Sequence, residues 1–231
     1  MSGPRPSSAF VTARRIVRDE AVARTERRLG VSPDVMPAIS GIAEEQLRPA
    51  LGDTDPRQAG WAALAAGTLI AKNGERLASA AGDQPLDHSF LCGLAWAALL
   101  VAVVGDTLLG IEEPTRARAW EPTPAALEAQ RTARELAIDP PDARSLAAAR
   151  FVTYAVSEIS GGLEQLDARQ AGFALLMLAV WIAGNAERIT EPLSRRRWLP
   201  RRHAIDPEEA SAGCAFTATV LADIGESLVS R

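Results

Sequence analysis

The sequence predicts an all-α protein of about eight main helices, arranged as two tandem four-helix repeats related by a pseudo-twofold axis. Three observations support this prediction. A segment of 23 residues, 55–77, recurs without a gap 112 residues later as 167–189, with twelve identical positions. Helix-start signals recur along both halves, and no stretch shows the sustained alternation and β-branched enrichment of a strand. A repeat of this length indicates a duplicated supersecondary unit, and here that unit is helical.

The helix starts are marked by a capping side chain directly before a proline, which suits the first helical turn. These pairs are Ser32-Pro33, Asp55-Pro56, Thr123-Pro124, Asp139-Pro140 and Asp206-Pro207. The helices are therefore expected over 8–29, 33–50, 56–80, 87–110, 124–137, 141–161, 167–190 and 206–229. The third helix of each half carries the repeated segment, so we expect these two helices near the centre of the molecule.

The domain boundaries follow from the repeat. Residues 1–112 form the first predicted repeat, 113–123 a linker that contains proline and glutamate, and 124–231 the second repeat. Matches outside the core segment keep the same order, since Gly105-Asp106 corresponds to Gly225-Glu226 at the ends of two late apolar segments. With 231 residues and 47% hydrophobic residues, the chain is long enough to pack both repeats as one compact unit.

The composition excludes several classes of protein. Cys92 and Cys214 lie inside apolar runs and resemble small buried hydrophobes, which predicts a reducing cytoplasm. The two histidines, His88 and His203, have no metal-ligand spacing around them, so no metal and no cofactor are expected. A net charge of −4 disfavours nucleic acid. The N-terminus lacks the apolar core of a secretory signal, and the longest apolar run, 91–104, is shorter than a membrane span.

The repeated helix carries a narrow polar stripe on an otherwise apolar side. Its members are the same residue types in both copies, namely Gln58, Asn73 and Arg76 in the first and Gln170, Asn185 and Arg188 in the second. Asn73 and Asn185 are the only asparagines of the chain, and asparagine is a poor residue inside a helix. In a structural interpretation these groups satisfy backbone atoms or pair across the pseudo-twofold axis. In a functional interpretation they line a ligand cavity between the repeats.

Acidic residues that follow apolar segments are the candidates for proton transfer. Asp106 comes two residues after the most apolar run of the chain, and Glu226 is its repeat counterpart, with Asp223 nearby. A desolvated carboxylate would have a raised pKa and could act as a general acid or base. The alternative is a carboxylate just past the core that caps a helix or pairs with arginine. Tyr154, the single tyrosine, is expected in the core.

An arginine-rich segment precedes the last helix and has no counterpart in the first half. Its arginines are Arg195, Arg196, Arg197, Arg201 and Arg202, with Trp198 among them. They form a candidate anion-binding loop for a phosphate, a carboxylate or an acidic partner. The alternative is a solvated charged loop.

These observations leave two classes of function. The first is a small-molecule-binding helical-repeat protein, including a cofactor-independent cyclase, isomerase or hydrolase that acts on an apolar metabolite between the repeats. The second is a non-catalytic scaffold or regulatory protein that uses its alanine-rich helix faces for association. Because alanine allows close helix approach, both hypotheses predict a homo-oligomer, with neither nucleic acid nor membrane as a partner.

Overall fold

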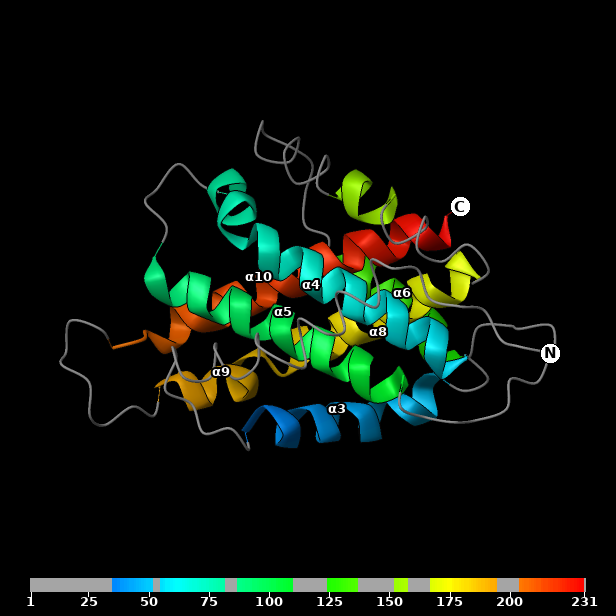
Figure 1. The fold of residues 1–231 in the computed structure, drawn as a ribbon, viewed down its shortest axis with the longest axis horizontal. Helices are drawn as coiled ribbons and strands as arrows, with labels where there is room; N and C mark the ends of the chain where they lie inside the picture. The colour runs from blue at the N-terminus through cyan, green and yellow to red at the C-terminus, as the bar shows by residue number, and fades with distance from the viewer. Residues whose placement is uncertain are drawn as a thin grey trace.

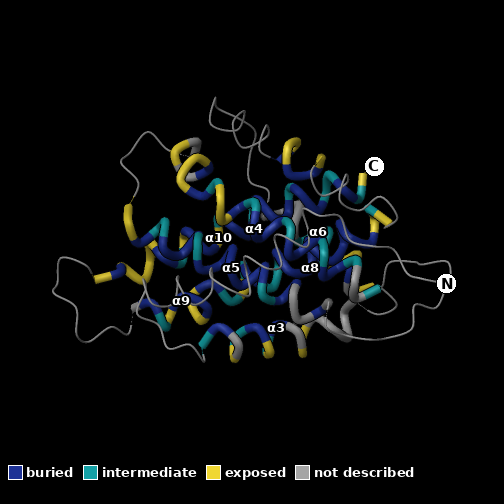
Figure 2. Tube along the Cα trace, viewed as in Figure 1, coloured by how far each residue is buried: buried dark blue, intermediate teal, exposed yellow. Residues whose placement is uncertain are grey.

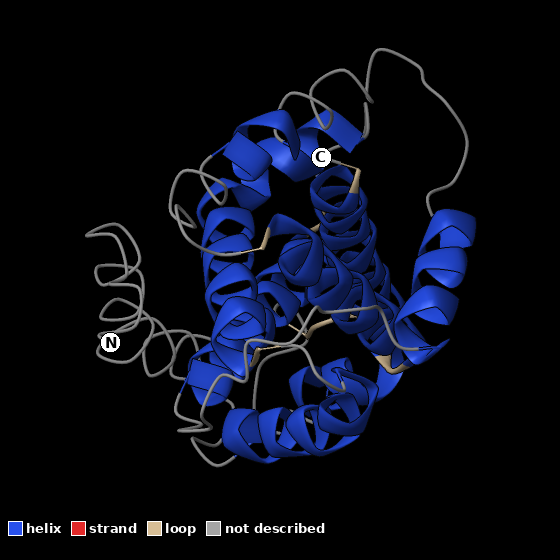
Figure 3. Ribbon diagram, turned by 90° about the vertical axis from the view of Figure 1, so that its right-hand side faces the viewer, coloured by secondary structure: helices blue, strands red, loops and turns tan. Residues whose placement is uncertain are grey.

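The computed structural model describes residues 35–51, 55–81, 87–109, 124–136, 152–157, 167–194 and 204–230. Throughout these ranges the chain is helical apart from short capping and connecting residues, with no strand (Figure 3). The predicted all-α class is therefore confirmed for this part of the chain. The helix expected over 8–29, the linker 113–123 and most of the helix expected over 141–161 lie outside the described residues.

The helix bounds agree with the expected ones to within a few residues, with one exception. The helices are α3 (Val35–Leu51), α4 (Pro56–Ala81), α5 (His88–Leu109), α6 (Pro124–Leu136), α8 (Ala168–Gly184), α9 (Ala186–Ser194) and α10 (Pro207–Val229). A further helical segment covers 152–157. The exception is the helix predicted over 167–190, which is two helices separated at Asn185.

The break at Asn185 bends α9 away from α8 by 64°. The backbone N–H of Asn185 donates to the carbonyl of Ile182, three residues back, at 3.2 Å, and Ile189 N donates to the Asn185 carbonyl at 2.8 Å. The first copy has Lys72 where the second has Gly184, a poorer helix former. The second copy also carries Pro192 inside α9, where it removes a backbone donor. Pro192 lies seven residues after the break, and the first copy has a glycine of its own, Gly74, where the second has Ala186, so these differences do not explain why only the second copy is broken.

Helices α4, α5, α8 and α10 form the centre of the molecule, and α3 runs along one side of it (Figure 1). Helix α5 packs against both α4 and α10, while α10 also packs against α8. The buried residues concentrate on these four helices (Figure 2). Trp96 of α5 and Phe173 of α8 are the bulkiest fully buried side chains. The repeated helices α4 and α8 are therefore part of the core, as the sequence predicts.

Helices α5 and α10 cross so closely that their backbones touch. A Cβ atom at Gly93 would lie 1.9 Å from the carbonyl oxygen of Ala210, and a Cβ atom at Gly213 would lie 2.0 Å from that of Phe90. Gly93 and Gly213 are 120 residues apart, as are Phe90 and Ala210. Gly93 therefore contacts Ala210, and Gly213 contacts Phe90, which is the repeat counterpart of Ala210. The two contacts are equivalent in the two repeats.

Within each half a similar contact joins the repeated helix to the last helix. A Cβ atom at Gly105 would lie 2.4 Å from the nitrogen of Leu64, and one at Gly225 would lie 3.1 Å from the nitrogen of Leu176. Leu64 and Leu176 occupy the same position of the repeated segment. The α4–α5 and α8–α10 pairs are thus held together at corresponding points, where only glycine allows this approach.

Two of the described helices, α5 and α10, are long and apolar enough to cross a membrane by length and composition, and the bent pair α8 and α9 would add a third if it formed one span. The apolar run 91–104 was expected to be too short for a membrane span, but helix α5 as a whole is long enough. Of the apolar windows of α5 and α10, 72% and 56% of the residues are buried inside the bundle. This burial is a second explanation for their apolar character.

Candidate functional site

The two glutamines of the polar stripes make reciprocal contacts between α4 and α8. The Oε1 atom of Gln58 accepts a hydrogen bond from the backbone N–H of Asp167 at 2.9 Å. In turn, the Oε1 atom of Gln170 accepts one from the backbone N–H of Asp55 at 3.2 Å. Asp167 and Asp55 are the residues directly before α8 and α4. Each repeated helix therefore binds the backbone at the start of the other.

The two asparagines make the same bond within their own helices. Nδ2 of Asn73 donates to the carbonyl of Leu69 at 2.8 Å, and Nδ2 of Asn185 donates to the carbonyl of Trp181 at 2.8 Å. Both side chains are half-buried. In α4 this bond is added to an unbroken helix. At the break after α8 it gives the Trp181 carbonyl a donor, because the backbone N–H of Asn185 points to Ile182 instead.

The arginines of the stripes, Arg76 and Arg188, are exposed. Each stripe therefore runs from the buried or half-buried glutamine, through the asparagine, to the surface. The surface pocket described below is not lined by stripe members. Whether the stripes bind a ligand stays a prediction.

The carboxylates proposed for proton transfer differ in what the structure describes. Asp106 lies in α5, but its side chain is outside the described part. Glu226 of α10 is half-buried and accepts a hydrogen bond from Nε2 of Gln130 in α6 at 2.9 Å. Asp223, one turn earlier on α10, has a pKa raised above its ordinary value by burial. Neither described carboxylate lies in the pocket described below.

The arginine-rich segment with Arg195, Arg196, Arg197, Arg201 and Arg202 lies outside the described residues. Its proposed anion binding stays a prediction. Tyr154 was expected in the core, and this is wrong, because its side chain is 48% exposed on the segment 152–157. The repeat counterpart of Tyr154 is Ile42, which is only half-buried, so the repeat does not determine whether this position faces the core.

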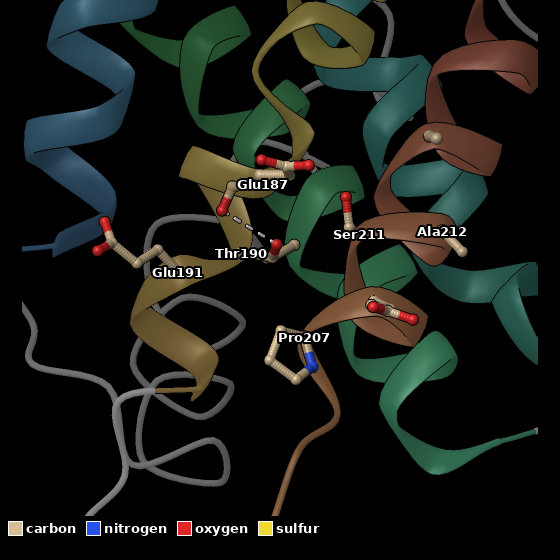
Figure 4. Close-up of a pocket in the computed structure, with 8 residues that line it drawn as sticks. Glu187, Thr190, Glu191, Pro207, Ser211 and Ala212 are labelled. Atoms are coloured by element: carbon tan, nitrogen blue, oxygen red, sulfur yellow. Dashed lines mark hydrogen bonds between the residues drawn. The ribbon is translucent and has the colours of Figure 1, made fainter.

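A surface pocket of about 570 Å³ lies between α9 and the first turns of α10 (Figure 4). It is lined by Glu187, Thr190 and Glu191 of α9 and by Pro207, Glu208, Ser211, Ala212 and Ala215 of α10. Glu187, Glu191 and Glu208 are exposed, so the rim is acidic. The hydroxyl of Thr190 is buried and donates to the Ala186 carbonyl at 2.9 Å. The pocket lies beside the bent helix α9, and this bend is a feature that the sequence did not predict.

No family model, curated protein or solved structure matches the chain. The interpretation of its site therefore depends on its own residues.

One pair of chemically active side chains was missed at the level of sequence. Sγ of Cys92 lies 3.6 Å from Nε2 of His88, one turn earlier on α5. The signal was present in the sequence, because residues four apart share a helix face. It was overlooked because His88 was considered as a metal ligand and not as a neighbour of Cys92. Among the described residues, no group of three or more histidine, cysteine or acidic side chains could hold a metal ion.

Proposed function

We propose that this chain is a non-catalytic scaffold or regulatory protein in which two like helical repeats dock about a pseudo-twofold axis. The observation that carries the proposal is the exchange of hydrogen bonds by Gln58 and Gln170 with the helix starts of the opposite repeat. A cavity would need these amides free to meet a ligand, whereas here their oxygens accept from the protein backbone. The reciprocal glycine contacts of α5 and α10 support the same axis.

Substitution of each glutamine tests the docking of the repeats. Gln58→Ala and Gln170→Ala should each lower the free energy of unfolding by about 1 kcal/mol, because an N–H at a helix start loses its partner. The loss should be larger for Gln170, which is buried, than for Gln58, which is half-buried. Gln58→Glu keeps an acceptor oxygen and serves as the matched control in chemical denaturation. Full stability of both alanine variants would contradict the proposal.

Association with a second copy is the mode of action that we propose for this scaffold. Leu127 of α6 and Tyr154 are the large apolar side chains that stand exposed in the described part, at 49% and 48%. Tyrosine and leucine at such positions suit a buried contact better than water. We expect size-exclusion chromatography with light scattering to give twice the 24.5 kDa mass of one chain.

A charged side chain at either position should weaken this association. Leu127→Arg and Tyr154→Arg should shift the light-scattering mass toward the monomer, because they place a charge in the contact. Ala71→Arg on the exposed side of α4 is the control and should leave the mass unchanged. A wild-type chain that stays monomeric up to high concentration would overturn the proposed self-association.

We propose a cytoplasmic location, with α5 and α10 apolar because they form the core. The exposed face of α4, beside α5, carries Lys72, Glu75 and Arg76 along its second half. Charged side chains facing lipid are strongly disfavoured. After cell lysis and ultracentrifugation without detergent, the chain should remain in the supernatant. Recovery in a membrane fraction that resists alkaline extraction would overturn this location.

Binding of a small molecule is the second candidate function, and the pocket between α9 and α10 favours it. Its volume lies in the range of ligand pockets. Its acidic rim suits a cationic ligand better than the apolar metabolite expected from the sequence. Spermidine should raise the melting temperature of the wild type, and Glu208→Gln should reduce that shift. An equal shift in both proteins would remove this pocket from consideration.

The cavity hypothesis for the polar stripes has its own test. If a ligand binds there, Asn73→Ala and Asn185→Ala should reduce its thermal shift while the helical circular-dichroism signal stays intact. A cyclase, isomerase or hydrolase with Asp106 or Glu226 as acid or base would require such a cavity.

A further inference from the structure

The two cysteines of the chain are both buried but differ in their neighbours. Cys214 of α10 is fully buried, and burial raises the pKa of its thiol to about 12. Cys92 lies in the second turn of α5, is 6% exposed, and has its Sγ 3.6 Å from Nε2 of His88. His88 itself is exposed at the first position of the helix. Only Cys92 therefore combines a thiol with a base that reaches solvent.

The start of α5 fixes this pair. The carboxylate of Asp87 accepts a hydrogen bond from the backbone N–H of Ser89, and the carbonyl of Asp87 accepts one from the N–H of Leu91 at 3.2 Å. These bonds begin the helix so that His88 and Cys92 share a face one turn apart. Hydrogen bonds from Ser89 lower the pKa of the Asp87 carboxyl most, and the charge of His88 contributes to the same effect. A carboxylate, an imidazole and a thiol thus follow one another along the first turns of α5.

The repeat counterparts of His88 and Cys92 line a surface pocket in the second half of the molecule. Glu208 and Ala212 of α10 lie 120 residues after His88 and Cys92, the same spacing that relates Gly93 to Gly213. Both line the surface pocket between α9 and α10. In the first half α4 continues without the bend that α9 makes, so access to the Cys92–His88 pair depends on the exposure of His88 itself.

We propose that Cys92 is a reactive thiol, activated by His88, that exchanges with small disulfides such as oxidised glutathione. The thiol transfers its proton to Nε2 of His88, and the resulting thiolate attacks one sulfur of the disulfide. The sulfur–sulfur bond of the reagent breaks as the bond to Cys92 forms, and the leaving thiolate takes the proton from His88. The products are a mixed disulfide on Cys92 and one free small thiol. This site is independent of the proposed scaffold function.

The first test compares the reaction rate of Cys92 in the folded chain with its rate in the unfolded chain, and it leaves His88 unchanged. In a Cys214→Ala chain, the release of the coloured thiol from an aromatic disulfide reports on Cys92 alone. Burial by itself would make this thiol react more slowly in the folded chain than in urea. Activation by His88 should make the folded chain react faster at the same pH, after correction with a free cysteine peptide in both solvents. A slower folded chain would overturn the proposal.

Removal of the base gives the second test. His88→Gln keeps a polar side chain of similar size but cannot take the proton, so the rate should fall by about tenfold at neutral pH, where an unactivated thiol is only a few per cent thiolate. Glu209→Gln, an exposed change in the first turn of α10, is the control and should leave the rate unchanged. Mass spectrometry after oxidised glutathione should place the adduct on Cys92 in wild type. An unchanged rate in His88→Gln, or an adduct on Cys214 in the folded chain, would contradict the assignment.

Discussion

The repeated helix is continuous in the first half of the molecule and broken in the second. Helix α4 runs through Asn73 to Ala81, whereas α8 ends before Asn185 and α9 leaves at 64°. Both asparagines nevertheless make the same 2.8 Å bond to the carbonyl four residues back. The asparagine is therefore compatible with either shape. The neighbouring residues, Gly184 in place of Lys72 and Pro192 in place of Ala80, distinguish the two halves.

A hydrogen bond from the first repeat holds helix α9 in its bent position. Nε1 of Trp96 in α5 donates to the carbonyl of Ile189 in α9 at 2.9 Å, and the indole is fully buried. The repeat counterpart of Trp96 is Phe216, which has no donor to offer. The asymmetry of the two halves thus includes a buried polar bond, and not only a difference in helix propensity.

The largest expected effect concerns the crossing that joins the halves. Gly93→Ala should lower the free energy of unfolding by about 3 kcal/mol or more, because its Cβ would lie 1.9 Å from a backbone oxygen and the helices must separate. Gly184→Ala is the matched control, since nothing lies within 4 Å of its Cβ. That control should gain about 0.5–1 kcal/mol from helix propensity. Chemical denaturation measures both, and equal losses at the two positions would refute the contrast.

The next effect concerns helix α9. Trp96→Phe installs the residue of the other repeat and leaves the carbonyl of Ile189 without its indole donor, which should cost about 1–3 kcal/mol. Hydrogen exchange of the backbone amides of α9 should become faster, while that of α4 stays as in wild type. Phe216→Leu is a control of comparable size change on α10. Unchanged exchange in α9 would show that the indole does not hold it.

A smaller pair of effects should have opposite signs in the two halves. Asn185→Ala should destabilise the fold by about 1 kcal/mol, because the carbonyl of Trp181 loses its donor at the break. Asn73→Ala should instead stabilise it by about 0.5 kcal/mol, because the carbonyl of Leu69 keeps its partner in an unbroken helix and alanine is the better helix former. Thermal and urea unfolding measure both variants. A loss of the same size at both sites would mean that the asparagines play one shared role.

The smallest effect is a dependence on pH that comes from Asp223, whose repeat counterpart is the uncharged Val103. Burial raises the pKa of Asp223 above its ordinary value of 3.8, so the folded state prefers the neutral carboxyl. The stability from this group is present below pH 3.8 and is lost as the pH rises through the folded value. Asp223→Asn should therefore raise the melting temperature at neutral pH and have little effect below pH 3.8. The counterpart Val103→Thr should show no such pH dependence.

Local signals were sufficient for most of the helix bounds. Asp206 caps α10 through bonds from the N–H groups of Glu208 and Glu209, as its position before a proline predicts. Asp167 caps α8 through the N–H of Arg169. These bonds join residues two or three apart, so a short stretch of sequence contains both partners. The break at Asn185 escaped prediction because a single glycine and a later proline are weak signals within a strongly apolar segment.

The hydrogen-bond partners of the polar stripes could not be predicted in the same way. The sequence identified Gln58 and Gln170 as a repeated pair, but their partners are 109 and 115 residues away. The contact of Trp96 with Ile189 spans 93 residues. Which backbone group a side chain reaches over such separations depends on how the helices dock, and docking is a property of the whole core.

The sequence by itself therefore determined the helical class, the duplicated segment and the capped helix starts, because capping, proline geometry and hydrophobic periodicity act over a few residues. The tertiary structure decided how α4 and α8 exchange their glutamine bonds, where α9 bends, and that Cys92 but not Cys214 keeps an imidazole beside its sulfur. The glycines at the crossings show the reason. Gly93 and Gly213 are ordinary residues in the sequence, and only the approach of two backbones makes the absence of a side chain necessary.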